Sequence, residues 1–248
     1  MSLSKKVGLV TGSSRGIGKA IAGGLAREGA KIVINYCSDD RAAQTTADEI
    51  ASQYGTEVEV VKADVSKEED VVRMIQNTEQ RFGSLDILVN NAGVHSDKVT
   101  WKMDILAWES VIATNLSGVF LCMKHAIPLM RLKSWGRIVN ISSVAGQVGL
   151  FGANNYCASK SGIFGLTKAV AREVADKNIT VNCIAFGYFD AGMNMRLSED
   201  VRERALQTIP MRRFGRLEEA VGPVVFLCTD EASYISGQVI HVNGGCYM

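Results

Sequence analysis

Two residues with reactive side chains, Tyr156 and Lys160, lie four positions apart in the segment NNYCASKSG, residues 154–162. On a helix this spacing puts a phenol and an ammonium group on the same face, one turn apart. Both groups take part in general acid–base catalysis, so the pair is a candidate for proton transfer. The same spacing also occurs by chance on solvated helices, and the rest of the chain must decide between the two interpretations.

A second candidate is the glycine-rich stretch LVTGSSRGIGKAIA, which ends the first apolar run and opens a helix-like segment. Glycine is needed where the backbone turns sharply, where a phosphate approaches, or where helix and strand pack closely. The amino end of the helix would offer free N–H groups to a pyrophosphate. The spacing G-x-x-x-G-x-G differs from the commoner G-x-G-x-x-G, but its place directly after the first strand favours dinucleotide binding over a structural turn. The expected contacts are Gly12, Ser14, Arg15, Gly16, Ile17 and Gly18.

The end of the second predicted strand bears on which dinucleotide is bound. NAD-binding proteins usually carry an acid about twenty residues after the glycine loop, which holds the ribose 2′-hydroxyl. Here the strand ends with Tyr36 and Cys37. Arg15 could offer its guanidinium to a 2′-phosphate, whereas Asp39 and Asp40 would repel that phosphate if they turned inward. We expect NADP(H) to be preferred, with NAD(H) as the alternative.

Seven β-rich runs recur along the chain, with helix-length segments between them. They start at residues 7, 31, 57, 85, 136, 179 and 238. Apolar strands that alternate with helices imply a parallel sheet covered on both faces, with right-handed crossovers. One helix should end near Gly29 and another should run from Ser66 to Gly83. We therefore expect a single α/β domain spanning residues 1–248.

The stretch from Phe186 to Arg216 lacks a clear strand. In a doubly wound fold, a long segment after the carboxyl end of a strand usually lies over the ligand crevice. We expect residues 186–216 to form a lid over the substrate.

Composition limits the possible partners. The formal net charge of +1 gives no broad electrostatic footprint for nucleic acid or anionic lipid, which favours a small-molecule partner. Six scattered cysteines and three separated histidines suggest reduced thiols and no metal site, as in a cytoplasmic protein. The first residues are too short a run for a signal peptide, and no run approaches eighteen apolar residues, so we expect no membrane span.

Five motifs occur together in one order: TGSSRGIG, NNAG at 90–93, TNLSGVF around Asn115, GRIVNISSVAG with Ser143, and Tyr156 with Lys160. In this order and spacing they resemble the short-chain dehydrogenase/reductase family, from Val7 to nearly the last residue. The resemblance implies a Rossmann fold and an NAD(P)-dependent oxidoreductase that acts on CH–OH or C=O groups. It supports the catalytic interpretation of the tyrosine and the lysine.

The resemblance also implies roles for the catalytic residues. Tyr156 would give its proton to a carbonyl oxygen as hydride arrives, although a free phenol with a pKa of about 10 suits this poorly. Lys160 would favour the phenolate and bond the nicotinamide ribose. Ser143, rather than Ser142, would hold the substrate oxygen. Asn115 would anchor a water that leads protons to Lys160.

Further residues are expected around the cofactor by the same resemblance. The adenine amino group would be bonded by Asp64 and its ring flanked by Val65, with the NNAG motif along the adenosine. The backbone near Phe189 would meet the nicotinamide carboxamide. These additional cofactor residues are Asp64, Val65, Asn91, Ala92, Gly93, Gly187 and Phe189.

Three positions depart from the family pattern. Phe186 precedes Gly187 where Pro-Gly is usual, and Ala191 stands where a threonine normally contacts carboxamide or phosphate. These changes should loosen nicotinamide binding by about 1 kcal/mol. Asn243 replaces the commoner aspartate, and the sequence offers no interpretation of that change.

Within the family, the chain is most similar to 3-oxoacyl-acyl-carrier-protein reductases and acetoacetyl-coenzyme A reductases. This implies NADPH-dependent reduction of a 3-oxoacyl thioester in fatty acid biosynthesis, by a homotetramer. The alternatives are a sugar or polyol dehydrogenase, a broad carbonyl reductase, or a non-catalytic dinucleotide sensor or scaffold. His95 is expected to be a pocket wall. Four basic residues could meet a carrier phosphate or form a solvated face: Arg196, Arg212, Arg213 and Arg216.

Overall fold

The computed structural model describes residues 2–192, 195 and 198–248. It is built around one seven-stranded sheet with the order β3-β2-β1-β4-β5-β6-β7. Every neighbouring pair of strands is parallel. Each of the seven predicted runs forms a strand, so the predicted fold class, a Rossmann-type parallel sheet, is confirmed. The strands are β1 (Val7–Val10), β2 (Lys31–Tyr36), β3 (Val58–Lys62), β4 (Ile87–Asn90), β5 (Gly136–Ser143), β6 (Ile179–Phe186) and β7 (Val239–Val242).

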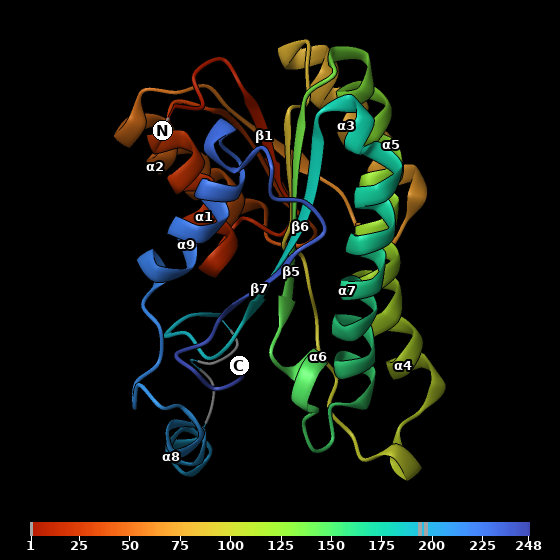
Figure 1. The fold of residues 1–248 in the computed structure, drawn as a ribbon, viewed down its shortest axis with the longest axis vertical. Helices are drawn as coiled ribbons and strands as arrows, with labels where there is room; N and C mark the ends of the chain where they lie inside the picture. Colours follow the sequence, from red (N-terminus) through yellow and green to blue (C-terminus); the bar gives the residue numbers. More distant parts are fainter. Residues whose placement is uncertain (1, 193–194, 196–197) are drawn as a thin grey trace.

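Helices cover both faces of the sheet (Figure 1). One layer contains α1 (Gly16–Arg27), α2 (Asp40–Tyr54) and α9 (Leu217–Leu227). The opposite layer contains α3 (Glu68–Phe82), α4 (Ile105–Ile112), α5 (Gly118–Lys133) and α7 (Asn154–Val174). The short helix α6 (Ala145–Val148) and the helix α8 (Glu199–Thr208) lie beyond the carboxyl ends of the strands. The strand order reverses between β1 and β4, which is where such folds bind ligands.

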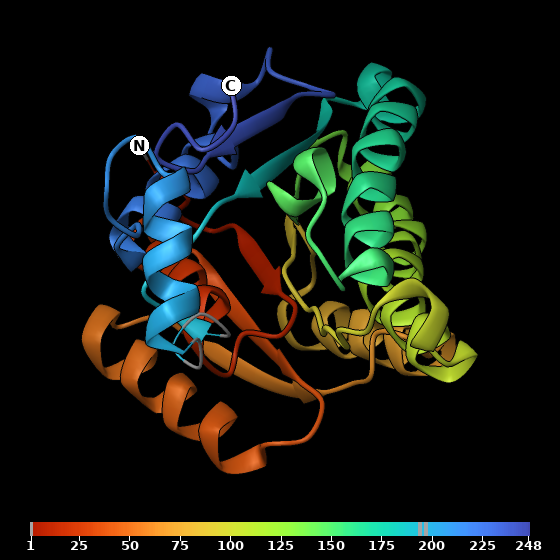
Figure 2. The same ribbon diagram turned by 90° about the horizontal axis from the view of Figure 1, so that it is seen from below.

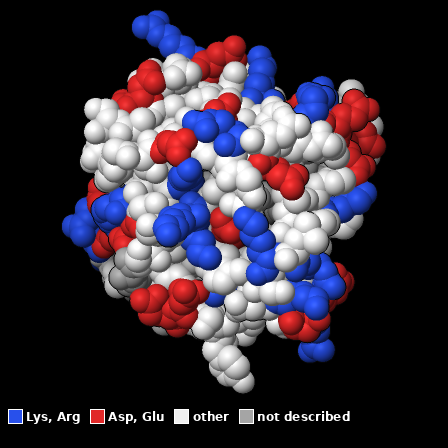
Figure 3. All heavy atoms as spheres, turned by 90° about the horizontal axis from the view of Figure 1, so that it is seen from above, with Lys and Arg blue, Asp and Glu red and all other residues white. Residues whose placement is uncertain are grey.

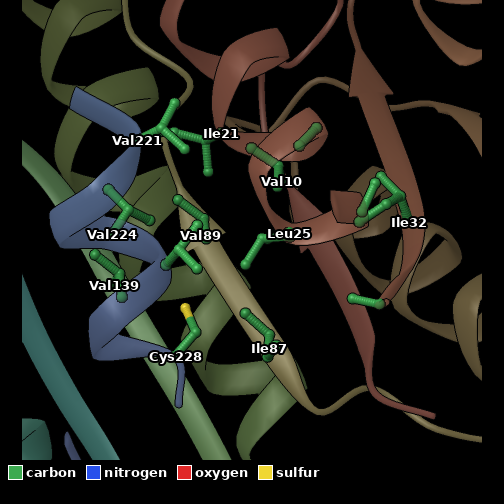
Figure 4. Close-up of a cluster of buried hydrophobic side chains, with 14 of the residues drawn as sticks. Val10, Ile21, Leu25, Ile32, Ile87, Val89, Val139, Val221, Val224 and Cys228 are labelled. Atoms are coloured by element: carbon green, nitrogen blue, oxygen red, sulfur yellow. The ribbon is translucent and has the colours of Figure 1, made fainter. Parts of the chain in front are cut away.

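A dry core joins the sheet to the first helical layer. Val10 and Val89 from the sheet, Leu25 from α1, and Val221 and Val224 from α9 are all buried and face one another (Figure 4). Burial of aliphatic side chains on both faces is the main stabilising contribution to such a fold. It also fixes the amino end of α1 beside the carboxyl end of β1, where the glycine loop lies.

The predicted helix from Ser66 to Gly83 begins later than expected. The helix α3 starts at Glu68, and its amino end is not capped by Ser66, whose hydroxyl donates to Asp64 Oδ1 at 2.7 Å. Its carboxyl end is as predicted, because Gly83 has a φ of 73°, in the left-handed region that glycine adopts readily. The serine thus stabilises the turn after β3 rather than the helix.

The two ends of the segment from residue 186 to residue 216 lie side by side. Phe189 and Gly215 form an isolated parallel bridge, and between them Ala205 of α8 forms a small apolar cluster with Ile209 and Phe214, which follow the helix. Seen from the carboxyl ends of the strands, α8 lies on the side of α1 and α9, while α6 lies on the side of α7 (Figure 2). Arg196, a predicted phosphate contact, lies outside the described residues.

A long apolar helix runs without interruption from Ile105 to Lys133, through a π-helical turn at Ala113–Ser117. By length and composition alone it could cross a membrane, with a mean hydropathy of 1.5 over eighteen residues. Core helices of soluble proteins pass the same test. One side of this helix packs into the core through Val119, Met123 and Ala126.

Candidate active site

The carboxyl end of β5 and the first two turns of α7 bring the predicted catalytic groups together. The side chain of Tyr156 lies close enough to that of Ser143, the last residue of β5, for Ser143 to lower its pKa. Lys160 is almost completely buried, and its Nζ donates to the carbonyl oxygen of Ile141 at 2.9 Å. The same Nζ lies 5.6 Å from the centroid of the Tyr156 ring. The i, i+4 spacing therefore does place both side chains toward one strand end.

The electrostatics of this group differ from the expectation in one respect. Burial lowers the pKa of Lys160 to about 8. Burial also raises the pKa of Tyr156, and the hydrogen bond with Ser143 only partly opposes that rise. The expected effect of Lys160 on the phenolate is not among the causes of this shift, the largest of which is desolvation. A raised pKa keeps the phenol protonated at neutral pH, which is the form that a general acid requires.

The two neighbouring serines have different surroundings. Ser142 is buried, and its hydroxyl donates to the carbonyl oxygen of Lys160 at 2.8 Å, which fastens α7 to β5. The Ser143 hydroxyl is only half-buried and accepts from the Ala145 N–H at 3.1 Å while it contacts Tyr156. Only Ser143 is therefore oriented toward the tyrosine, which agrees with the choice made from the motif.

Asn115 lies in the π-helical turn and is completely buried. Its side chain accepts from the Val94 N–H and donates to the Val94 carbonyl oxygen, both at 2.8 Å, and it also donates to Ser159 Oγ at 3.2 Å. A Cβ at Gly93 would lie 3.4 Å from Asn115 Oδ1 and 3.7 Å from Lys160 Nζ. The asparagine thus holds the strand-end loop after β4 against the catalytic lysine. π-Helical turns are frequent at functional sites.

The glycine loop has the shape that a pyrophosphate requires. Gly12 and Gly16 both have a φ of 60°, and a Cβ at Gly12 would lie 2.9 Å from Ala92 Cα. A Cβ at Gly18 would lie 2.5 Å from Gly12 O and 2.5 Å from Asn91 Nδ2. Only glycine at position 18 therefore allows α1 to pack this close to the loop. Arg15 is the N-cap of α1 and makes no capping hydrogen bond to the described backbone. The first turn of α1 can therefore bind an anion, and these residues fit a dinucleotide.

Two polar residues that the sequence analysis did not select hold this loop in place. Asn35 on β2 is buried; its Oδ1 accepts from the Gly12 N–H at 3.0 Å and its Nδ2 donates to the Ala63 carbonyl oxygen at 3.1 Å. Thr11 Oγ1 accepts from the N–H groups of Asn91 and Ala92 at 2.9 and 3.0 Å. The sequence signal for the role of Asn35 was the presence of a polar side chain within the apolar run KIVINY.

The predicted loop residues Ser14 and Ile17 are partly buried beside these positions. Ser14 accepts from Thr46 Oγ1 at 2.8 Å through its carbonyl oxygen, which ties the loop to α2. Ile17 packs against the core between the sheet and α1. Asn91 Nδ2 donates to the carbonyl oxygens of Thr11 and Gly12, so the NNAG motif braces the glycine loop.

The carboxyl ends of β2 and β3 border an open depression of about 480 Å³, which is lined by Cys37, Lys62, Asp64, Lys67, Asp70 and Arg73. Asp64 lies at its edge with Oδ1 accepting from the Ser66 N–H, and Val65 is buried against Gly118. Asp39 caps α2 by accepting from the Ala42 N–H at 3.0 Å. Asp40 pairs with Lys62 at 3.3 Å. These contacts hold both aspartates at the amino end of α2, where Asp40 also raises the pKa of Tyr36 at the end of β2.

The end of β6 shows how the departures from the family pattern are accommodated. Phe186 is buried and meets the ring of Phe189 edge-on, with centroids 5.0 Å apart. A Cβ at Gly187 would lie 2.7 Å from Asn243 Cβ, which explains why glycine is retained there. The side chain of Ala191 is buried. Asn243 Nδ2 donates to the Tyr247 carbonyl oxygen at 3.0 Å, a bond that a carboxylate could not donate.

Arg212, Arg213 and Arg216, three of the four basic residues considered for a carrier phosphate, each have a partner within the protein. Arg213 makes two hydrogen bonds of 2.7 Å to Glu219, and these lower the pKa of Glu219 to about 2. Arg216 contacts the same carboxylate at 3.5 Å, and Arg212 Nη1 donates to the Gln207 carbonyl oxygen. His95 is exposed, with Nδ1 3.4 Å from Asp97 Oδ1. All six cysteines carry free thiols.

Comparisons with known proteins identify the family. A family model described as enoyl-(acyl carrier protein) reductase matches residues 12–247. The chain is 43% identical over 247 residues to the 3-oxoacyl-[acyl-carrier-protein] reductase FabG of Aquifex aeolicus, covering 100% of this chain and 99% of the relative. It is 45% identical over 243 residues to the protein of that name from Staphylococcus aureus, covering 98% of each.

A solved structure leads to the same conclusion. A short-chain alcohol dehydrogenase of Sinorhizobium meliloti matches the fold with a TM-score of 0.94 at 39% sequence identity, covering 99% of this chain and 97% of that one. The similarity extends over nearly the whole of each chain, lid included. The chain is thus a member of the short-chain dehydrogenase/reductase family, and an NAD(P)-dependent oxidoreductase, as its motifs predicted.

Proposed function

We propose that this protein reduces a 3-oxoacyl thioester to the 3-hydroxyacyl thioester with NADPH, the acyl group being carried by acyl carrier protein or coenzyme A. The observation that carries the proposal is the placement of Ser143, Tyr156 and the buried Lys160 together at the carboxyl end of β5, with Lys160 Nζ 5.6 Å from the Tyr156 ring and bonded to Ile141 of that strand. The relatives from Aquifex aeolicus and Staphylococcus aureus are named as reductases of this substrate class, which supports it.

When bound, the nicotinamide dinucleotide supplies hydride to the carbonyl carbon. Ser143 holds the carbonyl oxygen through its hydroxyl, and Tyr156 donates its phenolic proton to the same oxygen, so that the alcohol forms without a free alkoxide. Lys160, with a pKa of about 8, carries a proton at neutral pH that can be returned to Tyr156. Asn115 anchors the water through which that proton is replaced.

The preference for NADPH rests on the acids near the end of β2. Asp39 is committed to the cap of α2 and Asp40 to Lys62, while Tyr36 and Cys37 replace the acid that would bond a free 2′-hydroxyl. Arg15, exposed at the amino end of α1, is the guanidinium proposed to bind the 2′-phosphate. The remaining cofactor contacts proposed are those of the glycine loop, Asp64, Val65, the NNAG motif, Gly187 and Phe189.

The wider setting belongs to the same proposal. We infer a single domain of residues 1–248 with a lid at 186–216, acting in the cytoplasm as a homotetramer on a small or carrier-bound acyl substrate. The face opposite the candidate site carries Lys and Arg interspersed with Asp and Glu (Figure 3). Such a mixture gives that face no field of one sign to attract nucleic acid.

A substrate panel tests the proposal. Acetoacetyl-coenzyme A, a 3-oxoacyl carrier protein, glucose and a diketone are each assayed with NADPH and with NADH. We expect the thioesters to be reduced fastest, with NADPH. Tyr156→Phe should lower kcat by about 10²–10⁴-fold while NADPH binding, followed by its fluorescence, is retained. Reduction of glucose alone would indicate a sugar or polyol dehydrogenase, and binding without any turnover would indicate a sensor.

A further inference from the structure

An apolar rim adjoins the proposed reacting groups. Four large side chains on two segments are exposed: Trp101 by 79%, Val148 by 52%, Leu150 by 42% and Phe151 by 92%. Three of them follow Ser143 within eight residues, on α6 and on the loop that leads into α7. Exposed apolar side chains gathered on adjoining segments commonly mark a binding site. The rim is defined as these four residues.

The loop that carries Leu150 and Phe151 is held firmly. Its tip is bracketed by Gly149 and Gly152, with φ values of 73° and 77°, which turn the chain sharply on both sides. The Leu150 N–H donates to Cys157 Sγ at 3.2 Å, one residue beyond Tyr156. The backbone that carries the two apolar side chains is therefore tied to the first turn of α7, beside the proposed general acid.

The segment that carries Trp101 is joined to the same loop. The Lys98 N–H donates to the Gly152 carbonyl oxygen at 2.7 Å, and Lys98 forms a parallel bridge with Ala153. Asn154 Nδ2 donates to Thr100 Oγ1 at 3.3 Å. Hydrogen bonds thus place the loop after β4 beside the loop after α6, near the amino end of α7 (Figure 1).

We infer that this rim binds the alkyl tail of the acyl group and sets the chain length that the enzyme prefers. The inference rests on the proposed function, in which the reacting carbonyl lies at Ser143 and Tyr156. The tail begins one carbon beyond that carbonyl and must therefore leave past residues close to them in space. Leu150 and Phe151 offer it preorganised apolar surface, whereas a short acetoacetyl group would end before reaching them. Each methylene fully buried there would add about fourfold to kcat/KM.

The test compares two thioesters on the same carrier, 3-oxobutyryl- and 3-oxodecanoyl-coenzyme A. The natural chain should prefer the decanoyl substrate. Phe151→Ser and Trp101→Ser should each lower kcat/KM for the decanoyl substrate about tenfold more than for the butyryl substrate. Both side chains are exposed, so these variants should fold. Tyr234→Ser is the matched control, because its fully exposed ring precedes β7 and so lies toward the amino ends of the parallel strands, whereas the rim lies at their carboxyl ends.

The possible results separate this inference from the proposed function. Equal losses on both substrates, or an unchanged preference, would overturn the assignment of the rim while leaving the reductase intact. A fall in molar mass by light scattering in the Phe151 or Trp101 variant would also overturn it, because the rim would then be covered by a second copy of the chain. If the natural chain reduces neither thioester, the proposed function and this inference both fail.

Discussion

At the residue scale, the buried charge of Lys160 serves the proposed reaction but lowers the free energy of unfolding. Its pKa is lowered from 10.5 to about 8 by burial, so between these values the unfolded chain binds a proton that the folded chain does not. The free energy of unfolding therefore rises with pH across this window, and the buried charge weakens the fold below pH 8. Lys160→Met should raise the free energy of unfolding at pH 7 by about 1–3 kcal/mol while it abolishes turnover.

Urea unfolding at pH 7 and at pH 9.5 measures this effect. The advantage of Lys160→Met should shrink at the higher pH, because the natural chain then loses the buried charge. Lys168→Met, an exposed position on the same helix, should change the stability little at either pH. A Lys160→Met chain that is less stable than the natural one at pH 7, or an advantage that does not depend on pH, would contradict the argument.

The chemistry of single side chains was easier to predict than their surroundings. Tyr156 and Lys160 were proposed from residue type and spacing, because few side chains can hold or move a proton, and Ser143 from the resemblance to the family. The support given by Asn35 to Gly12, 23 positions away, could not be found, since it depends on how β1 and β2 pair. The direction of the pKa shift at Tyr156 was also wrong in the sequence analysis, because burial is a tertiary property.

At the scale of elements, the contact between α1 and the glycine loop allows only glycine at position 18. Gly18→Ala would place a Cβ 2.5 Å from Gly12 O and 2.9 Å from Ser13 Cα, which forces the loop open. We expect Gly18→Ala to weaken NADPH binding at least tenfold and to lower the free energy of unfolding by about 1–3 kcal/mol, as overpacking usually does.

The same helix offers a matched control for this prediction. Gly23 lies inside α1, where a Cβ would make ordinary contact with the ring of Tyr54 at 3.7 Å. Gly23→Ala should raise the free energy of unfolding by up to about 1 kcal/mol, since alanine favours helix more than glycine does. Thermal unfolding and NADPH titration of both variants compare them. Equal effects of the two substitutions would refute the packing argument.

The strands were predictable because each is an apolar run buried on both faces by helices, whereas the irregular elements were not. Within the lid, α8 buries only Ala205, so its sequence lacks the apolar period that indicates a helix. The π-helical turn around Asn115 depends on contacts with Val94 and Ser159 that are distant in sequence. The amino end of α3 was misplaced because Ser66 bonds Asp64 instead of the helix.

At the scale of the whole molecule, the helix from Ile105 to Lys133 exposes more apolar surface than one soluble chain usually does. Ile105 is 65% exposed, Leu106 72% and Phe120 47%, and only 28% of its most apolar window is buried. Such a face must be covered by lipid or by protein. A second copy of the chain is the partner that our proposal of a homotetramer supplies, with the same surface used by each copy.

Light scattering tests this arrangement. The natural chain of 26.8 kDa should have the molar mass of a tetramer in solution. Leu106→Glu combined with Phe120→Glu should reduce that mass, because two carboxylates would lose their hydration in an apolar contact. Val201→Glu, at an exposed apolar position on α8, should leave the mass unchanged. A monomeric natural chain would refute the tetramer, and recovery of the chain with the membrane fraction would show instead that lipid covers this helix.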